Sequence, residues 1–106
     1  MIKGIGVDVT MLTRFIAKDD AFIKRILTPN EYQQFSGLND IRQVEYLAGR
    51  FCGKEAYYKA CKNRQISYHD VELLDDKEKG LTISDPHAHI SISHDGDYVI
   101  AFVVVE

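Results

Sequence analysis

The end of the chain carries a pattern that limits its possible architectures. Residues 89–94 alternate apolar and polar side chains up to an Asp95-Gly96 turn, and residues 98–105 return as a nearly continuous apolar run. Alternation, a tight turn and a second apolar run together predict a β-hairpin. A strand as apolar as the second one is typical of a central strand or of one covered on both faces.

The start of the chain predicts another strand, over residues 2–9. Its apolar face would carry Ile5, Val7 and Val9. Side chains of a strand alternate between its faces, so Asp8 falls on the other face, together with two glycines. We expect these glycines to leave room beside the carboxylate.

The middle of the chain predicts helices, which we infer from their capping residues. Thr13 could cap a short helix that includes residues 14–18, and Asp19 or Asp20 could cap the next one, through Ile26. The capping-box sequence 28–31, with Pro at the first helical position, predicts a helix to about residue 35 that stops at residue 37. A long amphipathic helix should begin at residue 39 or 40 and run to about residue 62.

Two further strands are predicted at residues 69–74 and 81–84, with a charged turn over 75–80. The sequence contains no internal repeat, low-complexity segment or linker. We therefore expect one α+β domain over residues 1–106, with an N-terminal strand, a helical middle and C-terminal antiparallel hairpins.

Length and charge narrow the possible functions. A chain of 106 residues has a thin core, which makes a homo-oligomer a reasonable expectation. The net charge of −3 argues against a nucleic-acid-binding protein, and no run is apolar and long enough to span a membrane. Cys52 and Cys61 lie nine positions apart in one predicted helix, which suits neither a disulfide framework nor a zinc motif. These features predict a cytoplasmic protein.

Two carboxylates, Asp8 and Glu55, stand in apolar patterns. Burial of an ionised carboxylate costs several kcal/mol, roughly, unless a cation or a donor compensates it. An oxygen-only pair therefore suggests a shared hard cation such as Mg2+. For Asp8, the alternative is that its side chain ends the strand and caps the next turn.

Glu55 and Lys59 are spaced i,i+4 on one face of the long helix. This spacing also suits an ordinary surface ion pair, which would stabilise the helix by only about 0.3–0.5 kcal/mol. His94, at the end of a predicted strand, could likewise be a partly exposed residue with no binding role.

Four segments together carry a family resemblance: GIGVDVTMLTRF (residues 4–15), RILTPNEY (25–32), EYLAGRFCGKEAYYKA (45–60) and SISHDGDY (91–98). In this order and at these spacings, the chain resembles the holo-acyl-carrier-protein synthases. These are the short bacterial 4'-phosphopantetheinyl transferases.

The resemblance implies a reaction and assigns residues to it. Phosphopantetheine would move from coenzyme A to a serine of apo acyl carrier protein, releasing adenosine 3',5'-bisphosphate, in fatty acid biosynthesis. Asp8 and Glu55 match the residues that hold Mg2+, and Glu55 is also placed to activate the serine, directly or through water. Lys59 would neutralise the diphosphate or protonate the leaving group. The positions that hold the nucleotide part of coenzyme A are Arg42, Arg50 and His94.

The resemblance also implies a homotrimer with active sites between protomers. The carrier protein would dock on the first helical region, for which the candidate residues are Arg14, Lys18, Phe22, Lys24 and Arg25. The chain departs from many relatives in having no glycine between residues 61 and 70, so Lys62 or Arg64 would have to replace a glycine-rich phosphate loop.

Two alternatives from other classes remain. The domain could be a catalytically silent module that binds coenzyme A. It could also be an oligomeric scaffold in which Asp8 and Glu55 are only structural, and substitutions there would then change stability more than activity.

Overall fold

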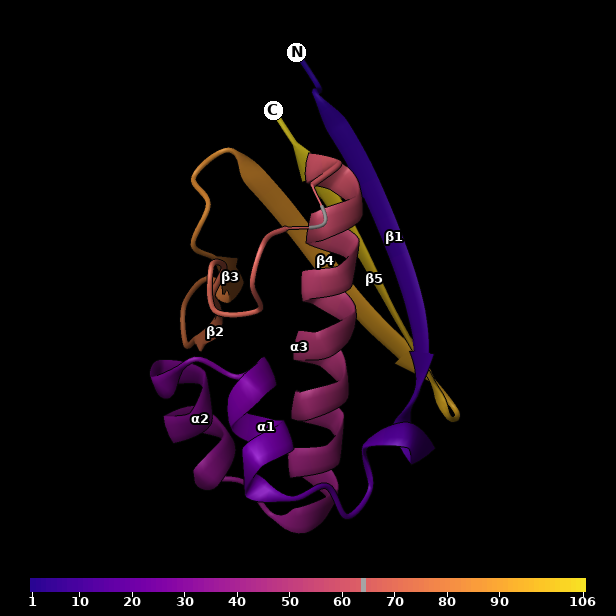
Figure 1. The fold of residues 1–106 in the computed structure, drawn as a ribbon, viewed down its shortest axis with the longest axis vertical. Helices are drawn as coiled ribbons and strands as arrows, with labels where there is room; N and C mark the ends of the chain where they lie inside the picture. The colour runs from indigo at the N-terminus through magenta and orange to yellow at the C-terminus, as the bar shows by residue number, and fades with distance from the viewer. Residues whose placement is uncertain (64) are drawn as a thin grey trace.

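The structure, a computed structural model, describes residues 1–63 and 65–106. Its main sheet has three antiparallel strands in the order β1 (Gly4–Met11), β5 (Tyr98–Val105) and β4 (Ala88–Asp95). The most apolar strand, β5, is central, which is one of the two arrangements that the sequence predicts. The chain ends lie close together at one end of the sheet (Figure 1).

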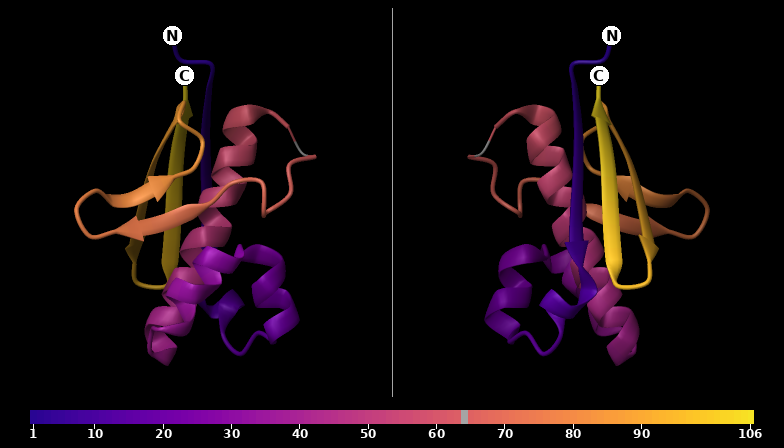
Figure 2. Two further views of the ribbon diagram at one scale, coloured as in Figure 1. Left: turned by 90° about the vertical axis from the view of Figure 1, so that its left-hand side faces the viewer. Right: turned by 90° about the vertical axis from the view of Figure 1, so that its right-hand side faces the viewer.

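The long helix α3 (Asp40–Cys61) packs along one face of this sheet (Figures 1 and 2). Its contact with β1 is very close, because a Cβ atom at Gly6 would lie 1.9 Å from the carbonyl oxygen of Ala56. At Gly4 a Cβ atom would lie 1.8 Å from the carbonyl oxygen of Ala60. The space that the glycines leave beside Asp8 is therefore occupied by the backbone of α3.

The three α-helices begin where the capping residues of the sequence predict. Asp19 caps α1 (Asp20–Ile26), and Asn39 caps α3. In α2 (Pro29–Ser36) the Thr28 side chain accepts from the Glu31 amide and the Glu31 carboxylate accepts from the Thr28 amide, so the capping box is complete.

The first predicted helix differs from expectation. Only a 3-10 turn forms, η1 (Leu12–Phe15), and Thr13 does not cap it. Strand β1 continues to Met11, and the turn begins directly after it at Leu12, so Thr13 lies inside the turn and not before it. The Thr13 hydroxyl instead donates to the Asp97 carboxylate, 3.1 Å away.

The small second sheet pairs β2 (Leu73–Asp76) with β3 (Gly80–Ile83). The strand predicted over residues 69–74 begins later than expected, at Leu73. The turn predicted over residues 75–80 is shorter and spans residues 77–79. A local turn competes with the strand, because the Ser67 amide donates to the Asp70 carboxylate and the Asp70 amide donates back to the Ser67 carbonyl.

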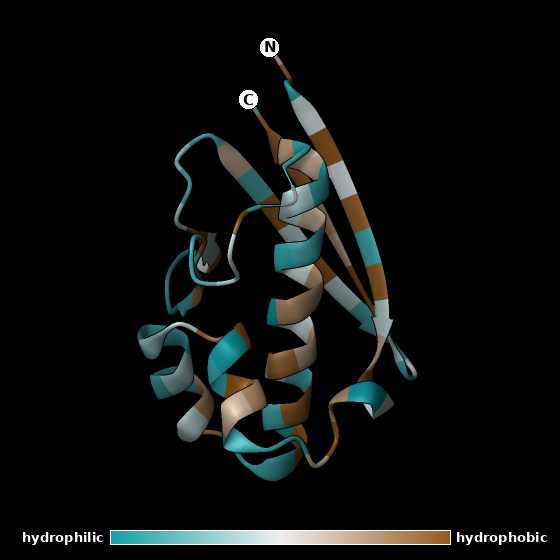
Figure 3. Cartoon of the chain, in the orientation of Figure 1, coloured by the Kyte–Doolittle hydropathy of each residue, from teal (hydrophilic) through white to brown (hydrophobic). Residues whose placement is uncertain are grey.

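The two faces of the main sheet differ in what covers them. Figure 3 shows apolar and less apolar residues alternating along β1. The apolar side chains of β1 point away from α3, and with the outer side chains of β5 they leave seven large residues 40–58% exposed: Ile5, Val7, Val9, Met11, Tyr98, Ile100 and Phe102. No helix in the described part of the chain is both long and apolar enough to cross a membrane.

Candidate active site

Asp8 lies in the middle of β1, opposite Ala101 of β5, and its half-buried side chain meets α3. Its Oδ1 atom is 3.0 Å from the Nζ atom of Lys59, which also donates to the Val7 carbonyl at 3.1 Å. The interpretation of Asp8 as a residue that ends the strand is therefore wrong. The close approach of β1 and α3 brings this carboxylate and this ammonium together.

Glu55 stands one helical turn before Lys59 and is half-buried. Its Oε1 atom accepts a hydrogen bond from the Tyr68 hydroxyl, 2.8 Å away. Lys59 pairs with Asp8 rather than with Glu55, so the i,i+4 spacing does not reflect a surface ion pair. Burial, followed by the bond to Glu55, raises the pKa of Tyr68 to about 12, and the hydroxyl is a donor at neutral pH.

An open cavity of about 810 Å³ adjoins these residues. Glu55 and Lys59 line it from α3, and Tyr68 lines it from the segment that follows the helix. Three basic side chains, Arg25, Lys59 and Lys62, stand on its walls. This combination of a carboxylate and several cations suits a phosphate-containing ligand next to a proton acceptor.

Lys62, and not a glycine, stands at the C-terminal end of the long helix. It ends α3 with φ = 58°, a left-handed backbone conformation that favours glycine. Its side chain lines the cavity, whereas Arg64, the other candidate for this role, lies outside the described residues.

Asp8 and Glu55 offer only carboxylate oxygens as ligands for Mg2+. Among residues 1–63 and 65–106 no group of three or more His, Cys, Asp or Glu side chains could hold a metal ion. Mg2+ commonly uses only one or two carboxylates, together with substrate phosphates and water. Asp8 and Glu55 fit that mode, because each has one carboxylate oxygen in a contact with Lys59 or Tyr68 and a second oxygen beside it.

The three residues expected to bind coenzyme A lie elsewhere on α3 and β4. Arg42 and His94 flank Glu45, with Arg42 Nε 3.4 Å from one carboxylate oxygen and His94 Nε2 3.7 Å from the other. Arg42 precedes Glu55 by 13 residues, which is about 20 Å of helix. The structure thus separates the predicted site residues into two groups within one protomer.

Arg50 is buried, and it contacts neither the Asp8, Glu55 and Lys59 group nor the Arg42 and His94 group. Its Nε atom donates to the Leu73 carbonyl at 3.0 Å, and its guanidinium lies 3.7 Å from the ring centre of Tyr46. Its Nη2 atom is 3.1 Å from Asp75 Oδ1 at an angle outside the hydrogen-bonding range, so this contact is an ion pair only.

The residues expected to dock the carrier protein form a basic surface with aromatic rings. Arg14 lies over the rings of Phe15 and Phe51, while Lys18 and Arg25 both lie over Phe22. Lys24 instead forms an ion pair with Asp20, with its Nζ atom 2.9 Å from Asp20 Oδ2. Because Arg25 also lines the cavity, this surface is continuous with the candidate active site.

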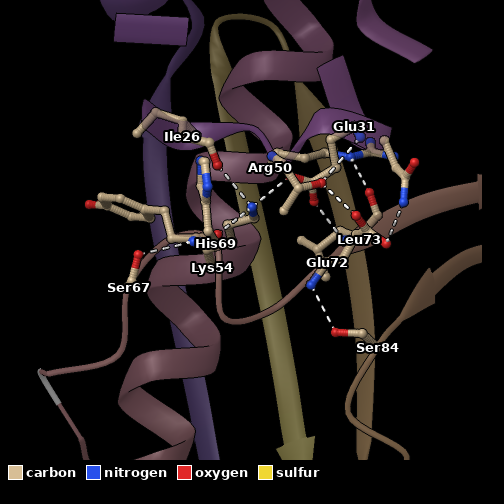
Figure 4. A network of polar contacts seen from close by, with 12 residues as sticks. Ile26, Glu31, Arg50, Lys54, Ser67, His69, Glu72, Leu73 and Ser84 are labelled. Carbon is tan, nitrogen blue, oxygen red and sulfur yellow. Dashed lines mark hydrogen bonds and ion pairs between the residues drawn. The ribbon is translucent and has the colours of Figure 1, made fainter. Parts of the chain in front are cut away.

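Sequence reasoning missed a buried polar network behind the site (Figure 4). Lys54 donates to Glu31, to the Ile26 carbonyl and to the Tyr68 carbonyl, at 2.6–2.8 Å. The capping box signals Glu31 only as a helix cap, and nothing in the spacing of Lys54 indicates its partner. The segment that carries Tyr68 is thereby tied to α1, α2 and α3.

Comparisons with known proteins identify the family of this chain. The family model of the 4'-phosphopantetheinyl transferase superfamily matches residues 4–103. The chain therefore belongs to this superfamily and, within it, to the holo-[acyl-carrier-protein] synthases. The holo-[acyl-carrier-protein] synthase of Geobacillus sp. (strain WCH70) is 44% identical over 116 aligned positions that cover 100% of this chain and 98% of that protein.

Solved structures show the same fold. The holo-(acyl-carrier-protein) synthase from Bacillus anthracis str. Ames, in complex with CoA (3',5'-ADP), superposes with a TM-score of 0.90 at 38% identity, covering 99% of this chain and 96% of that one. The enzyme from Neisseria meningitidis gives a TM-score of 0.89 at 32% identity, covering 100% of this chain and 99% of that one. The family and fold class predicted from the sequence motifs are confirmed.

Proposed function

We propose that this chain transfers the 4'-phosphopantetheine group of coenzyme A to a serine of apo acyl carrier protein. The observation that carries the proposal is an open basic cavity lined by Glu55 and Lys59, with Asp8 paired to Lys59, in a chain of this family. A phosphoryl transfer of this kind needs cationic charge along the diphosphate and an acceptor for the serine proton. These side chains provide both.

The reaction forms a bond between the serine oxygen and the phosphorus next to pantetheine, and it breaks the bond from that phosphorus to the bridging oxygen of the diphosphate. Glu55 accepts the serine proton, directly or through one water. The Lys59 ammonium stabilises the charge that develops on the departing adenosine 3',5'-bisphosphate. The basic side chain of Lys62 provides part of the phosphate contact that a glycine-rich turn would otherwise make.

Asp8 and Glu55 are the residues that would hold Mg2+. A bound ion would supply positive charge to the diphosphate oxygens. Oxygen-only donors and their half-buried position support this assignment over zinc, which favours Cys and His ligands.

The chain acts as a homotrimer in this proposal, and each site is shared between two protomers. Two observations support it. The seven exposed apolar residues on the outer sheet face form a patch of the kind that marks protein interfaces. In addition, Arg42 lies about 20 Å from Glu55 along α3, and His94 of β4 lies beside Arg42 at Glu45, so a neighbouring protomer is the natural source of the nucleotide contacts made by Arg42 and His94.

Acyl carrier protein docks on the surface formed by Arg14, Lys18, Phe22 and Arg25. An acidic partner is attracted by the three cations, and Phe22 offers an apolar anchor. Lys24 has a smaller role, because Asp20 already neutralises its charge. Two free cysteines, Cys52 and Cys61, are compatible with a reducing cytoplasmic setting for the reaction.

The proposal is tested by intact-mass spectrometry of apo acyl carrier protein incubated with this protein and coenzyme A. With Mg2+ the carrier protein should gain one phosphopantetheine group, and with EDTA it should not. A folded protein that binds coenzyme A yet produces no mass gain would instead identify a silent binding module.

A further inference from the structure

Tyr68 belongs to the segment after α3, and its hydroxyl donates a hydrogen bond to Glu55. Among the described residues, no other side chain of that segment does so. Tyr68 lies outside the helices and strands, 13 positions after Glu55, yet its hydroxyl is 2.8 Å from Glu55 Oε1. Its ring packs between those of Phe51 and Tyr58, with ring centres 5.9 Å and 5.5 Å away. The hydroxyl therefore approaches Glu55 from a ring that two other aromatic rings contact.

The backbone of Tyr68 is fixed from a second direction. Its carbonyl accepts from the Nζ atom of Lys54 at 2.6 Å, and Lys54 is fully buried and bound to Glu31. The next residue, His69, contacts the Lys24 carbonyl through its Nε2 atom at 2.8 Å. This segment is irregular in backbone shape, but charged and polar contacts to α1 and α3 determine where the Tyr68 ring lies.

We propose that Tyr68 is a positioning residue that holds the Glu55 carboxylate in its reactive orientation. The inference rests on the proposed function of Glu55 as the proton acceptor. A glutamate side chain has three rotatable bonds, and a half-buried one at a cavity wall can occupy several rotamers. A hydrogen bond to Oε1 selects one of them and directs the other oxygen, Oε2, to the reacting groups.

The geometry also explains why a tyrosine, and not a phenylalanine, is used at a site that is largely aromatic. Phenylalanine would keep the packing against Phe51 and Tyr58 but would lose the donor. The bond to Glu55 is made by a neutral donor and a carboxylate, and bonds of this type are among the stronger ones in proteins.

The test compares Tyr68→Phe with Tyr57→Phe. Tyr57 is a matched control, because its hydroxyl also donates to a carboxylate, that of Asp85 at 2.6 Å, and it lies outside the site. We expect Tyr68→Phe to lower kcat roughly ten- to a hundredfold, with the KM for coenzyme A changed by less than about twofold. Tyr57→Phe should change neither constant, although both variants lose one hydroxyl from a partly buried ring.

A second measurement does not depend on activity. Urea unfolding of Tyr68→Phe, Glu55→Ala and the double variant forms a double-mutant cycle. Non-additive losses of stability are expected if the hydroxyl acts on Glu55. Additive losses, together with an unchanged kcat in Tyr68→Phe, would overturn the inference.

Glu55→Gln separates this inference from the proposed function. Loss of transfer in Glu55→Gln, with full kcat in Tyr68→Phe, would reject the role of Tyr68 and leave the function of Glu55 intact. Full transfer in Glu55→Gln would reject Glu55 as the proton acceptor, and the inference about Tyr68 would fail with it.

Discussion

Lys54 and Glu31 form an ion pair in which neither side chain has any exposed surface, with Nζ and Oε1 2.6 Å apart. Burial lowers the pKa of Lys54, and the carboxylate of Glu31 opposes that shift. The other Glu31 oxygen accepts from the Leu73 amide at 2.6 Å. The pair thus joins α2, α3 and β2 directly behind the cavity.

Replacement of Lys54 should strongly destabilise the fold. We expect Lys54→Met to lower the free energy of unfolding by about 3–5 kcal/mol, because Glu31 would remain buried without its cation. The Ile26 and Tyr68 carbonyls would also lose their donor. Urea unfolding at pH 7 measures the change.

The matched control is Lys77→Met, in the exposed turn between β2 and β3. It should change the unfolding free energy by no more than about 0.5 kcal/mol. A loss of similar size in both variants would contradict a special role for the buried pair.

The contact between β1 and α3 predicts opposite effects for two glycine substitutions. Gly6→Ala places a Cβ atom 1.9 Å from the Ala56 carbonyl oxygen, which is backbone and cannot rotate away. We expect a loss of about 2–3 kcal/mol in unfolding free energy, and a loss of transfer because Asp8 and Lys59 are pushed apart.

Gly49→Ala, in α3, is the control. Its Cβ atom would meet only the Ile92 side chain, at 3.8 Å. An alanine in a helix is favoured over glycine by about 0.5–1 kcal/mol, so this variant should be more stable and remain active. Equal stability of the Gly6 and Gly49 variants would show that the close approach does not constrain β1.

Asp85 predicts a dependence of stability on pH. The Tyr57 hydroxyl and the His87 amide both donate to its carboxylate, and they lower its pKa below the usual value, with Tyr57 contributing more. The ionised form is therefore favoured in the folded state. Its contribution is fully present above the unfolded pKa of about 4 and is lost as the pH falls through the lower folded pKa.

Tyr57→Phe should accordingly be about 1 kcal/mol less stable than the native chain at pH 7, and this difference should shrink as the pH falls from about 4 to 2. Urea unfolding at several pH values measures it. In an Asp85→Asn background the effect of Tyr57→Phe should be independent of pH. A difference that stays constant in the native background would remove Asp85 as the cause.

The local signals in the sequence were sufficient for most of the fold. The capping residues Asp19, Thr28 and Asn39 and the alternation of the last two strands depend on neighbours within a few positions, and those elements form as predicted. The start of β2 was mispredicted because side-chain bonds of Ser67 and Asp70 compete with strand pairing. Such bonds leave no trace in hydrophobic periodicity.

The candidate site was predicted in part. Asp8, Glu55 and Lys59 were found through motifs, and Asp8 and Lys59 are in contact. Tyr68 and the Lys54–Glu31 pair were missed because their partners are 13 and 23 residues away and are brought together only by tertiary packing. The separation of Arg42 from Glu55 also needed the structure, since the motifs give no distances between elements.

The basic surface predicts a specific effect on the carrier protein. Arg14→Glu should raise the KM for apo acyl carrier protein about tenfold and weaken its dependence on salt, because charge reversal repels an acidic partner. The KM for coenzyme A should stay the same. Lys79→Glu, in the hairpin between β2 and β3, is the control and should change neither constant, whereas an equal effect of both substitutions would indicate only a general charge effect.

Sites shared between protomers predict that two inactive variants can restore activity in a mixture. One chain would carry Asp8→Asn, and the other both Arg42→Glu and His94→Ala. After joint unfolding and refolding at equal amounts, half of the chains supply an intact Asp8 and half an intact Arg42 and His94, so about a quarter of the sites should be functional. Size-exclusion chromatography with light scattering establishes that the mixture is trimeric. A trimer that stays inactive would show that each protomer must supply all of these residues to its own site.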